Sequence, residues 1–127
     1  MTTITEDYIS FETAKLLKEK GFDEICYLGY NKNGEYVPTS NRCNSQIIQP
    51  DFCLICCPTL QMAMKWLREV HNINIDIVSV WNQKRFEYQV FIVTPENADS
   101  PYYEHNPYKS YEEACEAAIK YCLEHLI

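Results

Sequence analysis

Seven cysteines are the residues of this 127-residue chain with the most evident capacity for chemistry. Cys53, Cys56 and Cys57 form a CxxCC cluster, and a CxxC pair binds zinc when both thiolates lie on one side of a tight turn. The sequence contains no second CxxC and no HxxxH. If residues 52–57 form a strand, Cys53 and Cys56 point to opposite faces and do not ligate one ion together. We therefore expect buried, reduced cysteines and no metal, and a thiol or metal module at this cluster is the third hypothesis for function.

Nucleophilic catalysis would need a nucleophile beside a base that is itself oriented. Two of the three histidines lie near the ends of predicted helices, where a cation suits the helix dipole. His105 lies in a Tyr-rich segment and is the histidine placed as a reactive or pH-sensitive group. Cys43, in a polar stretch, is predicted to be the most exposed thiol. A small-ligand-binding domain or enzyme that uses the 95–109 loop, with His105 and Cys43, is the alternative hypothesis, and we assign no catalytic residue.

The clearest positive signal is aromatic, because ten residues are Tyr and several gather near the C-terminus. A Tyr ring buries area at an interface while its hydroxyl keeps a hydrogen bond. Residues 95–127 also carry seven acidic and two basic residues, a local charge of −5. The same rings could instead pack a loop onto the sheet, so both interpretations stay open. The candidate binding residues are Tyr102, Tyr103, Glu104, His105, Tyr108 and Tyr111.

The charge balance disfavours nucleic acid as a partner. The chain has 11 Lys and Arg against 18 Asp and Glu, a net charge of −7, whereas phosphate binding needs clustered basic residues. Its three glycines are each explained by a local turn, helix end or strand, which leaves none for a phosphate cradle and predicts no nucleotide cofactor. We expect a protein partner or self-association through segment 99–113, extended in one version of the hypothesis by the polar loop 38–51.

Composition places the chain among ordinary globular proteins. Apolar residues make up 46% and charged residues 23%, and no apolar run approaches the length of a membrane span. The first seven residues are polar and acidic and lack the plan of a secretory signal. We therefore expect a cytoplasmic chain without membrane contact, reduced cysteines, and a single domain over residues 1–127.

The elements that must position these residues follow from periodicity and turn signals. Asn33-Gly34 predicts a type I′ hairpin that sets Tyr30 opposite Val37, before Pro38 stops the return strand and a loop over 38–51 begins. A longer hairpin is predicted with Ile75 opposite Ile92. The predicted helices cover residues 10–20, 59–71 and 110 onward, and the predicted strands cover 25–30, 35–37, 52–57, 73–81 and 86–94.

Together these elements predict an α+β fold. It consists of a mostly antiparallel sheet of about five strands with three helices, in the order αβββαββα. Ser110 and Glu113 form a capping-box pattern at the start of the last helix. In the second helix, Val70 is placed on the buried stripe and Trp66 at its edge.

Three stretches resemble a group of small uncharacterised proteins of gut Bacteroidetes and their phages or mobile elements. The stretches are PTLQMAMKWLREVH at 58–71, ISFETAKLLKEKGFDE at 9–24 and SYEEACEAAIKYCLEHLI at 110–127, and they cover less than half of the chain. The resemblance implies an intracellular setting and a phage or prophage origin, and it carries over no activity or ligand. The leading hypothesis is a small, non-catalytic intracellular binding or accessory protein.

Overall fold

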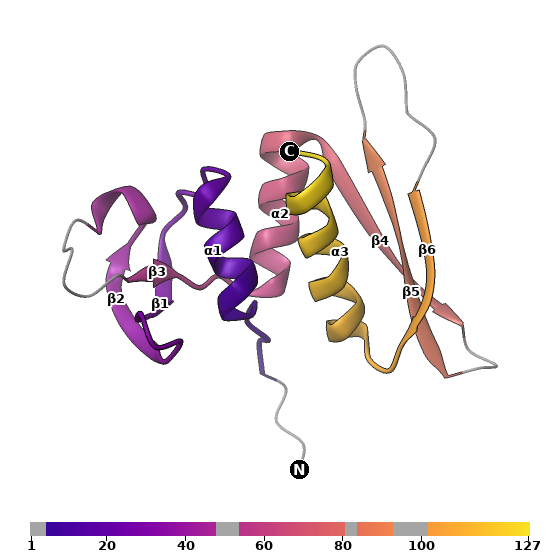
Figure 1. Cartoon of the computed structure of the whole chain (residues 1–127), viewed down its shortest axis with the longest axis horizontal. Coiled ribbons are helices and arrows are strands. Elements are labelled where there is room, and N and C mark those ends of the chain that lie inside the picture. The colour runs from indigo at the N-terminus through magenta and orange to yellow at the C-terminus, as the bar shows by residue number, and fades with distance from the viewer. Residues whose placement is uncertain (1–4, 48–53, 81–83, 93–101) are drawn as a thin grey trace. The chain divides into compact units, whose positions relative to one another are not determined.

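The computed structural model describes residues 5–47, 54–80, 84–92 and 102–127, and the side chains of 102–106 lie outside this description. The chain divides into two compact units, Met1–Thr59 and Leu60–Ile127, which are described one by one. Across the described residues, three helices and two antiparallel three-stranded sheets confirm the predicted α+β class (Figure 1). The described part of the chain holds six strands, not about five, so the order observed there is αβββαβββα. The single domain over residues 1–127 stays a prediction.

The first unit packs helix α1 against a small sheet. Its elements are α1 (Phe11–Glu19), β1 (Cys26–Tyr30), β2 (Tyr36–Arg42), a 3-10 turn over Asn44–Gln46 and β3 (Ile55–Cys56), and the strand order is β2-β1-β3. Ser10 caps α1 as predicted, because its hydroxyl accepts a hydrogen bond from the Thr13 backbone N–H at 3.2 Å. The core of the unit consists of Ile9, Ala14, Leu17, Phe22, Cys26, Tyr30, Cys56 and Cys57.

The register of the first hairpin differs from the prediction by one residue. Tyr30 pairs with Tyr36 and not with Val37. Gly34 adopts a φ of +79°, and its N–H donates to the Asn31 carbonyl at 3.0 Å, so the connection is a tight turn closed by a left-handed glycine. The Asn31 side chain also accepts from the N–H groups of Asn33 and Glu35. These two hydrogen bonds to the Asn31 side chain favour a connection that is longer than the two residues of a type I′ turn.

The polar stretch after Pro38 was predicted to be a loop, and that prediction was wrong for its first half. Strand β2 continues through Pro38 to Arg42, and a 3-10 turn follows at Asn44–Gln46. Pro38 is tolerated because β2 is an edge strand of the described sheet, where a missing N–H costs no ladder bond. Residues 48–53 lie outside the described part; they include Phe52 and Cys53, the first two residues of the strand predicted over 52–57, and the described remainder forms strand only at Ile55–Cys56.

The second unit places two helices on one face of a sheet (Figure 1). Its elements are α2 (Leu60–His71), β4 (Ile73–Val80), β5 (Arg85–Ile92), β6 (Tyr102–Tyr108) and α3 (Tyr111–His125), with strand order β4-β5-β6. Ser110 caps α3 as predicted by accepting from the Glu113 N–H at 3.1 Å. The Glu113 carboxylate accepts from the Lys109 N–H instead of the Ser110 N–H, so the second half of the predicted capping box is displaced by one residue.

The β4–β5 hairpin has the predicted faces in a register shifted by two residues. Ile75 pairs with Val90 and not with Ile92, and Val80 pairs with Arg85. A shift of two preserves which side chains share a face, because side-chain direction alternates with a period of two.

In α2, Trp66 is buried and Val70 is 54% exposed, so the buried stripe is rotated toward Trp66 from its predicted position.

Candidate functional site

The predicted contact segment, residues 99–113, contains a strand. Residues 102–108, predicted as part of a loop over 95–109, form β6 and pair with β5 in an antiparallel manner. Tyr has a high preference for strands, and three of the seven β6 residues are Tyr, which is the signal that could have indicated this strand. The strand was not predicted because apolar and polar residues do not alternate regularly along it. Residues 95–101 lie outside the described part.

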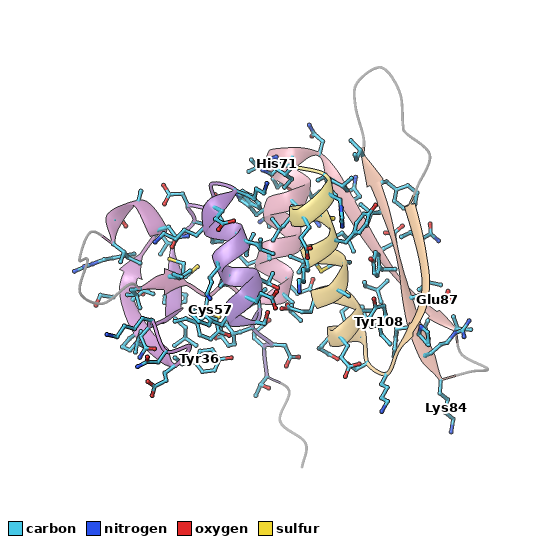
Figure 2. The ribbon with its side chains drawn as sticks, in the orientation of Figure 1. Tyr36, Cys57, His71, Lys84, Glu87 and Tyr108 are labelled. Carbon is cyan, nitrogen blue, oxygen red and sulfur yellow. The ribbon has the colours of Figure 1, made fainter. Side chains whose placement is uncertain are left out.

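Tyr108 packs onto the sheet face that carries α3 (Figure 2). Its ring lies 6.1 Å from that of Tyr88, which is 3% exposed, and Tyr88 in turn lies 6.3 Å from Tyr121 of α3. Tyr108 is half-buried. Its ring therefore contributes to the hydrophobic contact between sheet and helix, which is the packing interpretation left open above.

Tyr111 remains accessible at the first turn of α3. It is 38% exposed, and its ring lies 6.3 Å from Phe86 in an edge-to-face contact. The hydrogen bond with Gln61 lowers the pKa of Tyr111, but burial and the neighbouring Cys115 outweigh it, so the pKa is raised overall. The side chains of Tyr102, Tyr103, Glu104 and His105, the other predicted site residues, lie outside the described part of the chain.

Opposite His105, Asn106 and Pro107 the ladder between β5 and β6 is irregular. Phe86 pairs with Tyr108 and Tyr88 pairs with Glu104, so the register shifts around Glu87. The Glu87 side chain is directed to the sheet face away from Tyr88, and it is 3% exposed (Figure 2). Its carboxylate lies 3.0 Å from Arg85 Nη2. A buried carboxylate on this face was not predicted, because the sequence shows only a mixed polar and apolar pattern there.

One thiol of the first unit, that of Cys43, is less accessible than predicted. Cys43, expected to be the most exposed thiol, is only 9% exposed, and its Sγ lies 3.4 Å from the Ser45 hydroxyl. The 3-10 turn that follows Cys43 encloses the side chain, which corrects the prediction. Cys43 belongs to the first unit and His105 to the second.

Cys56 has a close neighbour that is distant in sequence. Its thiol donates to the Arg42 carbonyl at 3.3 Å, and Arg42 is the register partner of Cys26 across β1 and β2. A hydrogen bond between the two thiols is the largest cause of their pKa shifts, which raise the pKa of Cys26 and lower that of Cys56. Thirty residues separate the two cysteines, so no local pattern indicates this pair.

The cysteines of α3 are core residues. Both Cys115 and Cys122 are fully buried, and burial raises the pKa of Cys115 to about 11 and that of Cys122 to about 12. A thiol that holds its proton in this way is a weak nucleophile and a weak metal ligand. These two residues act as small hydrophobic side chains, as expected from the sequence.

Tyr30 provides a testable polar contact in the first unit. Its buried hydroxyl donates to the Ile9 carbonyl at 2.6 Å and lies 3.3 Å from the Tyr36 hydroxyl. Tyr30→Phe is expected to lower the free energy of unfolding by about 1–2 kcal/mol, because the Ile9 carbonyl loses its strongest donor. Urea unfolding at neutral pH measures this loss, and Tyr27→Phe, at a ring that is 75% exposed, should change it by less than about 0.5 kcal/mol.

The same residue predicts a pH dependence. Burial, followed by the hydrogen bond with Tyr36, raises the pKa of Tyr30 above its ordinary value of 10.0. A raised folded-state pKa gives stability that is fully present below about pH 10 and is lost as the pH rises further. The stability difference between wild type and Tyr30→Phe should therefore shrink between about pH 9 and about pH 11. A difference that stays constant over this range would contradict the assignment.

Comparisons with family models, with curated proteins and with solved structures found no match to the chain. The resemblance to small phage and Bacteroidetes proteins therefore stays a prediction. Within the described residues, no three or more His, Cys, Asp and Glu side chains are grouped so that they could hold a metal ion. No helix in the same part of the chain is long and apolar enough to cross a membrane.

Proposed function

We propose that this chain is a small non-catalytic binding protein that contacts a protein partner, or a second copy of itself, through β6 and the start of α3. The observation that supports the proposal best is the position of β6 at the edge of its sheet. Among the described residues β6 pairs with β5 alone, so one side of its backbone is not used by the sheet. An exposed edge accepts a strand from another chain by main-chain hydrogen bonds.

The edge available to a partner is short. Pro107 and the irregular pairing around Glu87 interrupt the second half of β6, whereas Glu104, Tyr103 and Tyr102 pair regularly with β5. Proline and bulges are devices that limit uncontrolled edge pairing. We therefore place the main-chain contact at residues 102–104.

Charge selects the kind of partner. Glu104 lies on β6, and Glu112 and Glu113 follow in the first turn of α3, within a region of local charge −5. Tyr111, which is 38% exposed beside these carboxylates, offers an aromatic contact. An acidic surface with accessible Tyr favours a partner that is basic and aromatic-binding, because opposite charges speed association and exclude like-charged surfaces.

The cytoplasm remains the compartment we propose, with a phage or mobile element as the origin of the gene. The reduced cysteines support the compartment, because six free, buried thiols are found in the described residues and no disulfide pairs them. The three sequence stretches described above support the origin.

The combined variant Tyr102→Ala, Tyr103→Ala and Tyr108→Ala tests the surface. We expect complex formation to weaken by about 100-fold or more, because interface tyrosines commonly contribute above 1 kcal/mol each. The measurement is native mass spectrometry for self-association and purification from the native host for a partner. Circular dichroism must show an intact fold, since Tyr108 also contacts Tyr88.

The matched control replaces two accessible tyrosines of the first unit. Tyr27 and Tyr36 are 75% and 58% exposed, so their combined change to Ala removes two accessible rings far along the chain from β6. The control should bind like wild type. Equal binding by wild type and the β6 variant would refute the proposed surface, and loss of binding only in the control would move the site to the first unit.

A further inference from the structure

The turn of the first hairpin contains two asparagines whose side chains are held differently. Asn31 Oδ1 accepts from the backbone N–H groups of Asn33 and Glu35 at 2.9 and 3.0 Å, and Asn31 Nδ2 donates to Glu35 Oε1 at 3.3 Å. Asn33 is exposed, and its side-chain amide has no hydrogen-bond partner among the described residues. Asn31 therefore holds the turn together, whereas nothing in the described part of the chain restrains the Asn33 amide.

The residue that follows Asn33 is a glycine. A backbone nitrogen can attack the side-chain carbonyl carbon of a preceding Asn and close a succinimide ring, and a Cβ on the attacking residue hinders that approach. Asn33-Gly34 is the only Asn-Gly pair in the sequence. Asn is among the thermolabile residues of proteins. The turn therefore combines an accessible amide with the least hindered nitrogen that can follow it.

The folded turn restrains this attack. The Gly34 N–H donates to the Asn31 carbonyl at 3.0 Å, and the Asn31 N–H donates to the Glu35 carbonyl at 3.0 Å. The attacking nitrogen must give up the proton that it shares with the Asn31 carbonyl, so this hydrogen bond has to open before the ring can close. Local opening of the hairpin therefore controls the reaction.

We propose that Asn33 is a site of spontaneous modification, at which the side-chain amide is converted to a mixture of aspartate and isoaspartate when the turn held by Asn31 opens. The site lies in the first unit, and it does not depend on the contact surface proposed above. Its only co-reactant is water.

The reaction balances without oxidation or reduction. The Gly34 nitrogen attacks Asn33 Cγ, its proton passes to Asn33 Nδ2, and the bond between Cγ and Nδ2 breaks so that ammonia leaves. Water then opens the succinimide at one of its two carbonyl carbons. Opening at Cγ breaks the new bond to the Gly34 nitrogen and gives aspartate. Opening at the backbone carbonyl carbon of Asn33 gives isoaspartate, in which the chain continues through the former side chain.

The isoaspartyl product would disturb the packing of the first unit. It adds one carbon to the backbone before Gly34, so the hydrogen bond to the Asn31 carbonyl loses its geometry. The turn lies against α1, because a Cβ at Gly34 would be 3.1 Å from Phe11 Cδ2, and the Phe11 ring lies 5.3 Å from that of Tyr30. Aged protein should therefore unfold at a lower urea concentration than Asn33→Asp, which carries the added charge on an unaltered backbone.

The experiment incubates the full-length, reduced protein at mildly alkaline pH in heavy-oxygen water and follows its peptides by mass spectrometry. In the folded protein we expect Asn33 to react before any other Asn, with isoaspartate among the products and one solvent oxygen in each product. In guanidinium chloride the reaction should be at least about 10-fold faster, because the Gly34 N–H is no longer held. Asn44 is the internal control and should stay intact in the folded protein, since its side chain bonds the Phe22 carbonyl at 2.8 Å and the Cys56 N–H at 3.0 Å.

Two substitutions test the two roles. Asn31→Ala removes side-chain bonds that hold the turn, and it should speed the conversion of Asn33 at least about 3-fold in the folded protein. Gly34→Ala should slow the conversion at least about 5-fold when both chains are compared in guanidinium chloride, where folding has no influence. If Asn31→Ala fails to fold, the comparison of folded and unfolded wild type decides by itself. Aspartate without isoaspartate, or equal rates in folded and unfolded wild type, would overturn the proposal.

Discussion

Replacing Gly29 with Ala is expected to lower the free energy of unfolding by about 3 kcal/mol, near the upper end of the cost of overpacking a core. A Cβ at Gly29 would lie 2.8 Å from the Ile55 carbonyl oxygen, 3.0 Å from Thr39 Cγ2 and 3.1 Å from a Leu54 methyl group. The nearest of these atoms is backbone of the neighbouring strand, so a side-chain rotation does not relieve the contact. Strands β1 and β3 would have to separate. Urea unfolding monitored by circular dichroism measures the loss.

A control at Gly21 separates packing from backbone strain. A Cβ at Gly21 would meet nothing within 4 Å, but the residue has a φ of +92° at the end of α1. Gly21→Ala should therefore cost only about 1–2 kcal/mol, the penalty of a left-handed conformation for an L residue. If Gly21→Ala were the more destabilising of the two changes, the close approach of β3 to β1 would be contradicted.

Arg85→Met is expected to lower the free energy of unfolding by about 2 kcal/mol. The Glu87 side chain is 4% exposed, and the substitution would leave its carboxylate buried without the guanidinium 3.0 Å away. Removal of one partner from a buried ion pair costs about 3–5 kcal/mol, and the 33% exposure of the Arg85 side chain reduces this figure through solvent screening. Thermal and urea unfolding measure the effect.

The paired change Arg85→Met with Glu87→Leu provides the control for that prediction. Removing both charges also removes the desolvated carboxylate, so the double variant should recover at least half of the lost stability. Lys84→Met, at the adjacent exposed residue that extends from the hairpin, should change stability by less than about 0.5 kcal/mol (Figure 2). A double variant as unstable as the sum of its single changes would argue that the ion pair does not cause the effect.

Features that depend on neighbouring residues in the sequence could be predicted. Ser10 and Ser110 cap their helices as expected, because a cap needs only a hydroxyl and the N–H three residues ahead. The buried faces of β4 and β5 were also predictable, because side chains alternate between the two faces of a sheet and a register shift of two residues leaves each one on its predicted face. The position of the stripe on α2 was predicted less well, since burial of Trp66 and exposure of Val70 depend on what the helix packs against.

For the candidate site, the sequence predicted the residue types but not their secondary structure. The sequence indicates Tyr and acidic residues between 99 and 113, but not that residues 102–108 are an edge strand, because pairing with β5 is a long-range backbone interaction. The enclosure of Cys43 escaped prediction for a similar reason, since the turn over Asn44–Gln46 is held by bonds to Phe22 and Asp23.

By itself, the sequence determined the α+β class, the helices and their caps, the apolar faces and the acidic character of the C-terminal region. These properties follow from periodicity, local hydrogen bonds and composition. Only the tertiary structure decided the strand registers, the place of β6 at a sheet edge, the burial of Glu87 and the approach of Cys56 to Cys26. Each of these features depends on contacts between segments that are distant in the sequence. No local pattern of side chains indicates which distant segments come together.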